Sequence, residues 1–377
     1  MTSRFPSTSV DMIYLDPPFF SKRRYYVRSP IASGVVGFED RWRGGIGEYI
    51  DWMSHRLVEF RRILKPTGSI YVHCDPHASH YLKVMMDEIF PSNFRNEIVW
   101  KRQSSHNDGR QGARHFGRIH DVILFYTRSS KYKWHPQFRP YSEEYIRKNY
   151  RHVDRRGRRY ALGDLSGPSG FSKGNPEYEF LGIRRYWRYS RKRMNRLLRE
   201  QRIVQVRPGR VPQLKRYLDE MPGVPIQDVW TDIKPLAAMS SERVAFPTQK
   251  PLALLERIIL ASTNPGDLVV DPFCGCGTTL MAAQKLNRKW IGVDISPKAC
   301  TIVRKRMLSM KVKARVINLR SKSSDFDRVL KGQTTDGPRI AANHFSALSM
   351  MKSLGSREGN RRKIAIVTPL VARAKRA

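Results

Sequence analysis

Four consecutive residues near the start of the chain, Asp16-Pro17-Pro18-Phe19, combine a carboxylate, two rigid backbone positions and an aromatic ring. This set suits chemistry on an amino group attached to an aromatic ring, whose lone pair is delocalised and therefore weakly nucleophilic. The Asp16 carboxylate and the Pro17 carbonyl could each accept one N–H of such a group, and the prolines would hold that carbonyl in place. Phe19 could stack on a base swung out of a duplex. Taken alone, the four residues would more often be an Asp that caps a loop, with prolines ending a strand.

A second candidate site lies far along the chain, in Asp271-Pro-Phe-Cys-Gly-Cys-Gly-Thr-Thr279. The flanking residues predict a strand before this segment and a helix after it, so the glycines would form the turn. Glycine permits positive φ and lets a ligand lie against the backbone, and the helix N-terminus offers free N–H groups. Asp294 ends the next predicted strand, 17 residues after Gly277, where a carboxylate could bind ribose hydroxyls.

Other uses of the glycine-rich segment fit less well. A P-loop needs Gly-Lys-Ser/Thr, whereas Thr278 follows Gly277, and a nicotinamide site would need three glycines in a longer spacing. Cys274-x-Cys276 could ligate a metal, but no second Cys or His pair stands at zinc spacing, so we predict no metal site. A strand-to-helix turn that binds nothing is the structural alternative.

The elements that would position both sites alternate between strand and helix. Apolar runs predict strands at 10–15, 69–75, 97–101, 120–127, 267–271 and 289–294. Helical spacing predicts helices at 47–64, 80–90, 251–263, 278–286 and 297–310, the first ended by Lys65-Pro-Thr-Gly68. This alternation is typical of a doubly wound α/β sheet.

Charge points to a polyanionic partner. The chain has 70 Lys and Arg against 33 Asp and Glu, a net charge of +37. Residues 131–220 hold 24 basic and 9 acidic side chains interleaved with aromatics, so we predict a folded binding insert at 129–245. Residues 301–377 hold 19 basic and 4 acidic side chains, and beyond residue 320 weak periodicity predicts a flexible tail.

Composition also bounds the location of the protein. A 40% hydrophobic content indicates a globular chain. Four cysteines in 377 residues do not form a disulfide framework, which favours a reducing compartment. No segment has the composition of a signal peptide or a membrane span, and we expect a cytoplasmic protein.

In this order, the segments resemble the amino-methylating DNA methyltransferases of the beta order, the DNA methylase N-4/N-6 family, and especially type III modification subunits. Asp16-Pro-Pro-Phe19 is similar to the family's Asp-Pro-Pro-Tyr/Phe motif, and residues 271–279 to its cofactor motif, with Cys276 where serine is usual. The resemblance covers roughly residues 10–310. It also includes the segments 64–75, 96–101, 120–126, 230–233 and 246–251.

The resemblance implies a Rossmann-like fold that binds S-adenosylmethionine and methylates the exocyclic amino group of adenine in double-stranded DNA, with the target base flipped. It implies a catalytic loop made of Asp16, Pro17, Pro18 and Phe19. It implies cofactor contacts from Lys250 (near the methionine end), Asp271, Phe273, Gly275, Gly277, Thr278 and Asp294. Four regions follow: a catalytic half at 1–128, a target-recognition insert at 129–245, a cofactor-binding half at 246–320, and the basic tail at 321–377.

Several alternatives stay open. Family members carry a Gly-Asp segment ahead of the catalytic strand, which here begins at residue 10. We therefore expect either that another segment supplies the adenosine contacts or that the cofactor binds weakly. Cytosine amino-methylation is the nearest other activity, although Ser-Pro-Pro is commoner in such enzymes, and a catalytically impaired DNA-binding relative is a further alternative. A glutamine methylase would carry its cofactor motif first and would not need the basic insert. A restriction-subunit partner and a homodimer are both compatible with the sequence.

Overall fold

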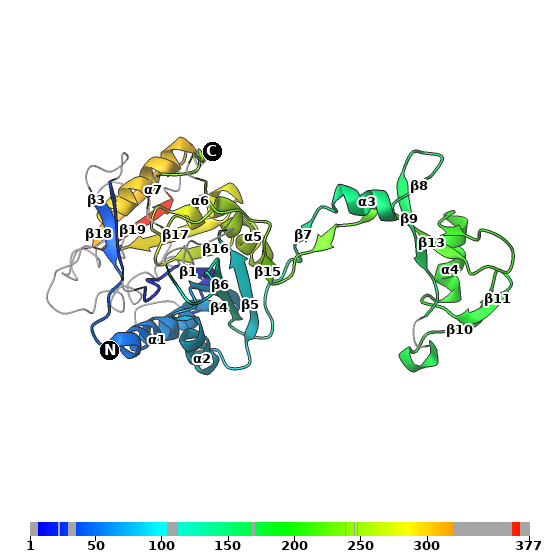
Figure 1. Cartoon of the computed structure of the whole chain (residues 1–377), viewed down its shortest axis with the longest axis horizontal. Coiled ribbons are helices and arrows are strands. Elements are labelled where there is room, and N and C mark those ends of the chain that lie inside the picture. The colour runs from blue at the N-terminus through cyan, green and yellow to red at the C-terminus, as the bar shows by residue number, and fades with distance from the viewer. Residues whose placement is uncertain are drawn as a thin grey trace, which may run out of the picture. The chain divides into compact units, whose positions relative to one another are not determined.

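A nine-stranded mixed sheet lies at the centre of the first of two units into which the chain divides (Figure 1). The computed structural model describes residues 7–21, 23–28, 35–103, 112–167, 170–237, 239–244, 246, 248–319 and 364–369. The first unit comprises residues 1–136 and 227–377, and the second comprises Gln137–Ile226. The reaction-centre residues predicted above all lie in the first unit.

The middle of this sheet is parallel. Strand β1 (Val10–Leu15), buried along its whole length, pairs in parallel with β4 (Leu64–Cys74) on one side and with β16 (Leu268–Asp271) on the other. Strand β17 (Lys289–Asp294) pairs in parallel with β16. Two segments separated by more than 250 residues are therefore adjacent strands, as the predicted sheet requires.

The outer strands are mixed in direction. Strand β6 (His120–Thr127) is antiparallel to β4, and β5 (Phe94–Lys101) is antiparallel to β6. The other edge holds β19 (Ile364–Pro369) and β18 (Ala314–Leu319), paired antiparallel to each other. Across the whole sheet the order is β15 (Val229–Trp230), β5, β6, β4, β1, β16, β17, β19, β18.

Helices cover both faces of the sheet. Ile70 and Val72 of β4 join the core beneath α1 (Gly45–Ile63) and α2 (Ser79–Ile89). Tyr71, between them, points to the opposite face, where its hydroxyl is 2.6 Å from the Oγ of Ser262 in α5 (Leu252–Ser262). The cofactor half adds α6 (Thr278–Lys285) and α7 (Pro297–Ser309) (Figure 1). The doubly wound α/β fold is therefore confirmed.

The second unit is a small folded body. Its four-stranded antiparallel sheet has the order β12 (Ile203–Val204), β13 (Gln213–Tyr217), β9 (Arg159–Asp164), β8 (His152–Val153). Hairpin β10 (Glu177–Phe180)–β11 (Ile183–Tyr186) and helix α4 (Arg191–Arg199) share a core that includes Trp187 and Met194. The unit also holds α3 (Glu143–Asn149), two 3-10 turns (Gly170–Lys173 and Leu218–Glu220), and the pair β7 (Phe138–Arg139)–β14 (Val224–Pro225).

The structure refines several boundaries. Strand β4 starts at Leu64, so Lys65–Gly68, predicted to end the preceding helix, lie within a strand. Hairpin β2 (Arg24–Arg28)–β3 (Val35–Glu39) was not predicted. The separate unit is shorter than the predicted insert, because residues near each end of 129–245 belong to the first unit; the N–H of His135, for example, donates to Ala261 O.

The predicted flexible tail, 321–377, lies outside the described residues except for 364–369. Those six residues form β19. Their apolar composition, Ile-Ala-Ile-Val-Thr-Pro, suits an inner strand of the sheet, whereas the basic residues around them dominated the compositional argument.

Candidate active site

The two predicted sites meet at one edge of the sheet. Asp16 directly follows β1, Asp271 ends β16, and Asp294 ends β17, and these strands run in parallel. Because neighbouring parallel strands end at the same edge, all three carboxylates lie there, which is the place where ligands bind in open α/β sheets. The fold thus joins the start of the chain to a loop some 255 residues later.

Asp16 is held by a lysine. The Nζ of Lys250 donates to both carboxylate oxygens of Asp16, at 2.8 and 2.7 Å, and lies 5.0 Å from the centre of the Phe19 ring. The Lys250 side chain is 10% exposed and that of Asp16 is 19% exposed. Such a shielded, two-point pair fixes the direction of the carboxylate better than an exposed ion pair would.

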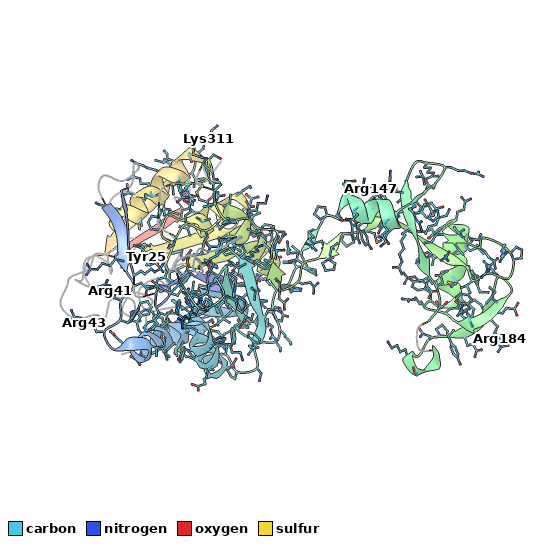
Figure 2. The ribbon with its side chains drawn as sticks, in the orientation of Figure 1. Tyr25, Arg41, Arg43, Arg147, Arg184 and Lys311 are labelled. Carbon is cyan, nitrogen blue, oxygen red and sulfur yellow. The ribbon has the colours of Figure 1, made fainter. Side chains whose placement is uncertain are left out.

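The loop after Asp16 is clamped by a second carboxylate, Asp40. Its oxygens accept the backbone N–H groups of Phe19 (3.0 Å), Phe20 (3.0 Å) and Ser21 (2.6 Å), and the Nε1–H of Trp42 (3.1 Å). Asp40 is 1% exposed, and its own N–H donates to Arg23 O across the base of the β2–β3 hairpin. The residues beside this anchor, Arg41 and Arg43, are exposed (Figure 2).

One face of Phe19 is already occupied. The His73 ring stacks on it with centroids 5.6 Å apart and planes 20° apart. His73 is fully buried, its Nδ1 lies 2.7 Å from the Tyr14 hydroxyl, and its Nε2 lies 3.1 Å from Asp121 Oδ2. Nε2–H donates to the Asp121 carboxylate, and Nδ1 and the Tyr14 hydroxyl are bonded to each other.

Asp121 is the charged end of this chain of contacts. Burial alone would raise its pKa, but the bond to His73 and the charges of Lys250 and Arg102 outweigh burial and leave the pKa of Asp121 below its ordinary value. The Asp121 carboxylate is therefore ionised and fixes His73 beneath Phe19. Sequence reasoning missed both this chain and the Asp40 clamp, since no local motif marks residues that meet 20 to 60 positions apart.

The glycine-rich turn has the predicted geometry. Gly275 and Gly277 have φ of +50° and +82°, and Gly277 caps the N-terminus of α6. A Cβ on Gly277 would lie 2.7 Å from Val303 of α7, and one on Gly275 would lie 3.0 Å from the Phe246 ring. The N–H of Gly275 donates to Asp294 Oδ2 at 2.9 Å, which ties the turn to the end of β17.

Two carboxylates, at the ends of β16 and β17, have raised pKa values. Burial raises the pKa of Asp271 to about 7, although Thr279 and the Phe273 N–H donate to it, and the negative charges of Asp16 and Asp294 add to the rise. Burial likewise raises the pKa of Asp294 to about 6. The charges of Asp16 and Asp294 thus disfavour ionisation of Asp271, so this edge of the sheet would favour a ligand that brings positive charge.

Aromatic side chains connect the two loops. Phe273 of the glycine-rich loop lies 5.9 Å from Trp52 of α1, and Trp52 lies 5.1 Å from Trp42. Tyr49 of α1 contacts both Trp42 (5.0 Å) and Phe20 of the Asp16 loop (6.0 Å). The Asp16 loop and the glycine-rich loop therefore share one packed cluster.

The segment that carries Lys250 is ordered by its own side chains. Gln249 accepts the Val244 N–H and donates to Glu242 O, and a Glu242 carboxylate oxygen accepts the Leu252 N–H. Phe246 packs against Cys276 of the glycine-rich turn. Lys250 had been placed near the cofactor by resemblance; the structure adds that it bonds Asp16.

The structure therefore brings all of the predicted site residues to one edge of the sheet. Pro17 is buried, Pro18 is half-buried, and Thr278 is buried at the start of α6. Cys274 and Cys276 are buried and free. Among the described residues, no group of three or more His, Cys, Asp and Glu side chains could hold a metal ion, and no helix there is long and apolar enough to cross a membrane.

A doubly wound sheet with a Pro-Pro loop and a glycine-rich loop at one edge defines a class of group-transfer enzyme. The family described as DNA methylase matches residues 10–305, which is most of the chain. This chain therefore belongs to the DNA methylase family, as the sequence had predicted.

Individual relatives agree with this assignment. Type II methyltransferase M.EcaI of Enterobacter cloacae is 33% identical over 300 residues, which cover 78% of this chain and 64% of that protein. DNA adenine methyltransferase YhdJ of Escherichia coli K12 is 26% identical, covering 78% and 74%. The StyLTI Mod subunit, from a type III restriction-modification enzyme of Salmonella typhimurium LT2, is 26% identical, covering 74% and 47%.

A solved structure also aligns over most of the chain. TTHA0409 of Thermus thermophilus, complexed with S-adenosyl-L-methionine, is 17% identical, with a TM-score of 0.42, covering 81% of this chain and 88% of that one. The chain spans about two thirds or less of M.EcaI and of StyLTI Mod.

Proposed function

We propose that this protein transfers the methyl group of S-adenosylmethionine to the exocyclic amino group of adenine in double-stranded DNA. The observation that carries the proposal is the meeting of the Asp16 loop and the glycine-rich loop on the adjacent parallel strands β1 and β16. Membership of the DNA methylase family supports methyl transfer to DNA. The name of YhdJ, a DNA adenine methyltransferase, favours adenine over cytosine.

The residues at the edge of the sheet fit S-adenosylmethionine. The glycine-rich turn leads into the N-terminus of α6, where backbone N–H groups can bind a ligand. Asp294 can offer carboxylate oxygens to ribose hydroxyls, and the raised pKa values of Asp271 and Asp294 indicate where positive charge would be favoured. We assign the cofactor to Lys250, Asp271, Phe273, Gly275, Gly277, Thr278 and Asp294.

In the proposed mechanism, the cofactor supplies a methyl group on a positively charged sulfur, and the protein prepares the nucleophile. Asp16 accepts one N–H of the adenine amino group and the Pro17 carbonyl accepts the other, which localises the lone pair on nitrogen. Lys250 holds Asp16 in position through both carboxylate oxygens, and Phe19 stacks on the base. The cofactor, held by the residues named above, would donate its methyl group to this nitrogen, and Asp16 is placed to accept the proton that the nitrogen loses.

Asp16→Ala tests this assignment. We expect methyl transfer to fall by at least about 1000-fold, since the acceptor for the amino group is lost, while DNA affinity and its salt dependence stay unchanged. The measurement is incorporation of labelled methyl groups, followed by digestion of the DNA to nucleosides. Asp51→Ala, at an exposed position of α1, is the control. Methylcytosine in place of methyladenine would contradict the base assignment, and full activity of Asp16→Ala would contradict the mechanism.

We further propose that the catalytic and cofactor halves, predicted at 1–128 and 246–320, act together in the first unit, and that the second unit recognises the target sequence. The second unit has 22 Lys and Arg against 9 Asp and Glu. Arg147 on α3 and Arg184 on β11 are among its exposed basic side chains (Figure 2). Similarity to a Mod subunit supports a restriction subunit as protein partner, which co-purification with that subunit would test.

A further inference from the structure

The loop between β5 and β6 exposes a phenylalanine. Phe116 is 98% exposed, and its neighbours Arg114, His115 and Arg118 are exposed as well. A single exposed apolar side chain is ordinary on a protein surface. Phe116 differs because its loop lies at the active-site edge of the sheet and is fixed there by hydrogen bonds.

The loop belongs to the active-site edge of the sheet. Cys74, at the end of β4, pairs with Val122 near the start of β6, and Lys101, at the end of β5, pairs with His120. Because β4 is parallel to β1, the strand that delivers Asp16, the β5–β6 loop starts and ends at the same edge as Asp16. Asp121, five residues after Phe116, bonds the His73 ring that stacks on Phe19.

The stem of the loop is fixed on both sides of the connection. The N–H groups of Arg102 and Gln103 both donate to Ile119 O, at 2.9 and 3.3 Å. Arg118 Nη1 donates to His77 Nε2 at 2.6 Å, and His77 Nδ1 donates to Asp75 at 2.7 Å, immediately after β4. Phe116 is thus two residues from a side chain that is tied to the active-site edge.

We propose that Phe116 is a wedge that enters the base stack of the duplex and fills the gap left when the target adenine swings out to Asp16 and Phe19. The inference rests on the proposed function, since it needs DNA as the substrate. Apolar side chains inserted between base steps are a general means of unstacking a duplex. Three residues lie between Phe116 and the start of β6, a span of about 13 Å when fully extended. This exceeds the depth of a DNA groove, about 8 Å, and the flanking Arg114 suits the phosphates beside it.

The test compares two substrates that differ only in whether the target base is already unpaired. One duplex carries the methylated site found in the activity assay; the other carries the same site with an abasic position opposite the target adenine. For Phe116→Ala we expect kcat/KM to fall about 30-fold on the paired duplex and less than 3-fold on the unpaired one, because the wedge is needed only to open the pair. Phe116→Leu should restore most of the activity.

Two controls separate this role from others. Val84→Ala, at a 62% exposed position of α2, should behave as wild type on both substrates. Binding of S-adenosylmethionine by Phe116→Ala, measured by calorimetry, should match wild type. A loss of equal size on both duplexes, or no loss on either, would overturn the wedge.

A direct readout of base extrusion distinguishes failure of the inference from failure of the proposed function. With 2-aminopurine at the target position, wild type should raise its fluorescence on binding, and Phe116→Ala should raise it several-fold less. If wild type extrudes the base without methylating it, the proposed function is wrong while the wedge stands. If both proteins extrude the base equally, the wedge is wrong while the proposed function stands.

Discussion

At the scale of single residues, the contact with Lys250 fixes the direction of the Asp16 carboxylate at the reaction centre. A carboxylate that accepts two N–H···O bonds from one ammonium still has lone pairs free for the amino group of a base. The same ammonium lies over Phe19, so one side chain orders both the acceptor and the stacking ring. Lys250 is a positioning residue for Asp16 in this arrangement.

We predict that Lys250→Met lowers kcat about 100-fold, because a loss of alignment near 1 Å costs about that much. Single-turnover methylation with saturating cofactor and DNA measures this effect. Lys289→Met, at an exposed position of β17, provides the matched control. An intact kcat in Lys250→Met, whatever the change in cofactor affinity, would show that the lysine does not position Asp16.

The raised pKa of Asp271 predicts how the free energy of unfolding depends on pH. Its folded-state pKa of about 7 lies above the ordinary value of 3.8, so the fold disfavours the ionised form. The resulting destabilisation is absent below about pH 4, where both states are protonated, grows as pH rises, and is complete above about pH 7. Asp271→Asn should therefore raise the free energy of unfolding at pH 8, by up to about 4 kcal/mol, and leave it almost unchanged at pH 4. Urea denaturation at the two pH values measures the difference; an equal change at both would show that burial of the charge is not the cause.

At the scale of elements, the turn between β16 and α6 depends on glycine for two separable reasons. Gly277 has φ of +82°, and a Cβ there would also lie 2.7 Å from Val303. Gly266, in the turn before β16, has φ of +84° with nothing within 4 Å of its Cβ position. Both glycines thus have a left-handed backbone that strains other residues, but only a Cβ at Gly277 would also clash with Val303.

We predict that Gly266→Ala costs about 1 kcal/mol of folding free energy, from the left-handed conformation alone. Gly277→Ala should cost about 2–4 kcal/mol, since the clash with Val303 adds to that strain. Cofactor affinity should fall only in the second variant. Chemical unfolding and calorimetry check both values, and equal losses in the two variants would show that Val303 yields without cost.

Local pattern was enough to predict six of the nine strands of the sheet and the helices that cover it, but not β15, β18 and β19 or the contacts that complete the site. The apolar run of β1 and the glycines before α6 indicate their structure within ten residues. The Asp40 clamp depends instead on a hairpin that composition does not mark, and His73 meets Asp121 across 48 positions. A buried histidine or aspartate in a strand looks the same in sequence whether it binds a ligand or supports a neighbour.

At the scale of the whole molecule, the residues that meet at the site lie far apart in the sequence. For this reason only the resemblance could place them in one site. Lys250 and Asp16 lie 234 positions apart, and the strands that carry the two loops, β1 and β16, are more than 250 residues apart in the sequence. Spacing within a single sequence carries no information on such pairs. The insert is a similar case. Its basic composition indicates where it lies in the sequence, but its boundaries depend on tertiary contacts that composition does not show.

The second unit can be removed at a point where its ends meet. Strands β7 and β14 pair as it enters and leaves, and the Ile226 N–H donates to Gln137 O at 2.9 Å. Joining Gln137 to Ile226 through Gly-Ser-Gly should therefore leave the first unit folded and its cofactor affinity within about 3-fold of wild type. DNA affinity should drop by at least about 100-fold at low salt, and the salt slope should shrink by about 0.9 for each phosphate that the protein no longer neutralises.

Alanine at the four exposed arginines of α4 (Arg191, Arg193, Arg196, Arg199) tests the same charge without deletion and should reproduce part of the effect. Titrations at several salt concentrations measure both quantities. An unchanged slope in both variants would place the phosphate-binding residues in the first unit and would contradict the recognition role proposed for residues 137–226.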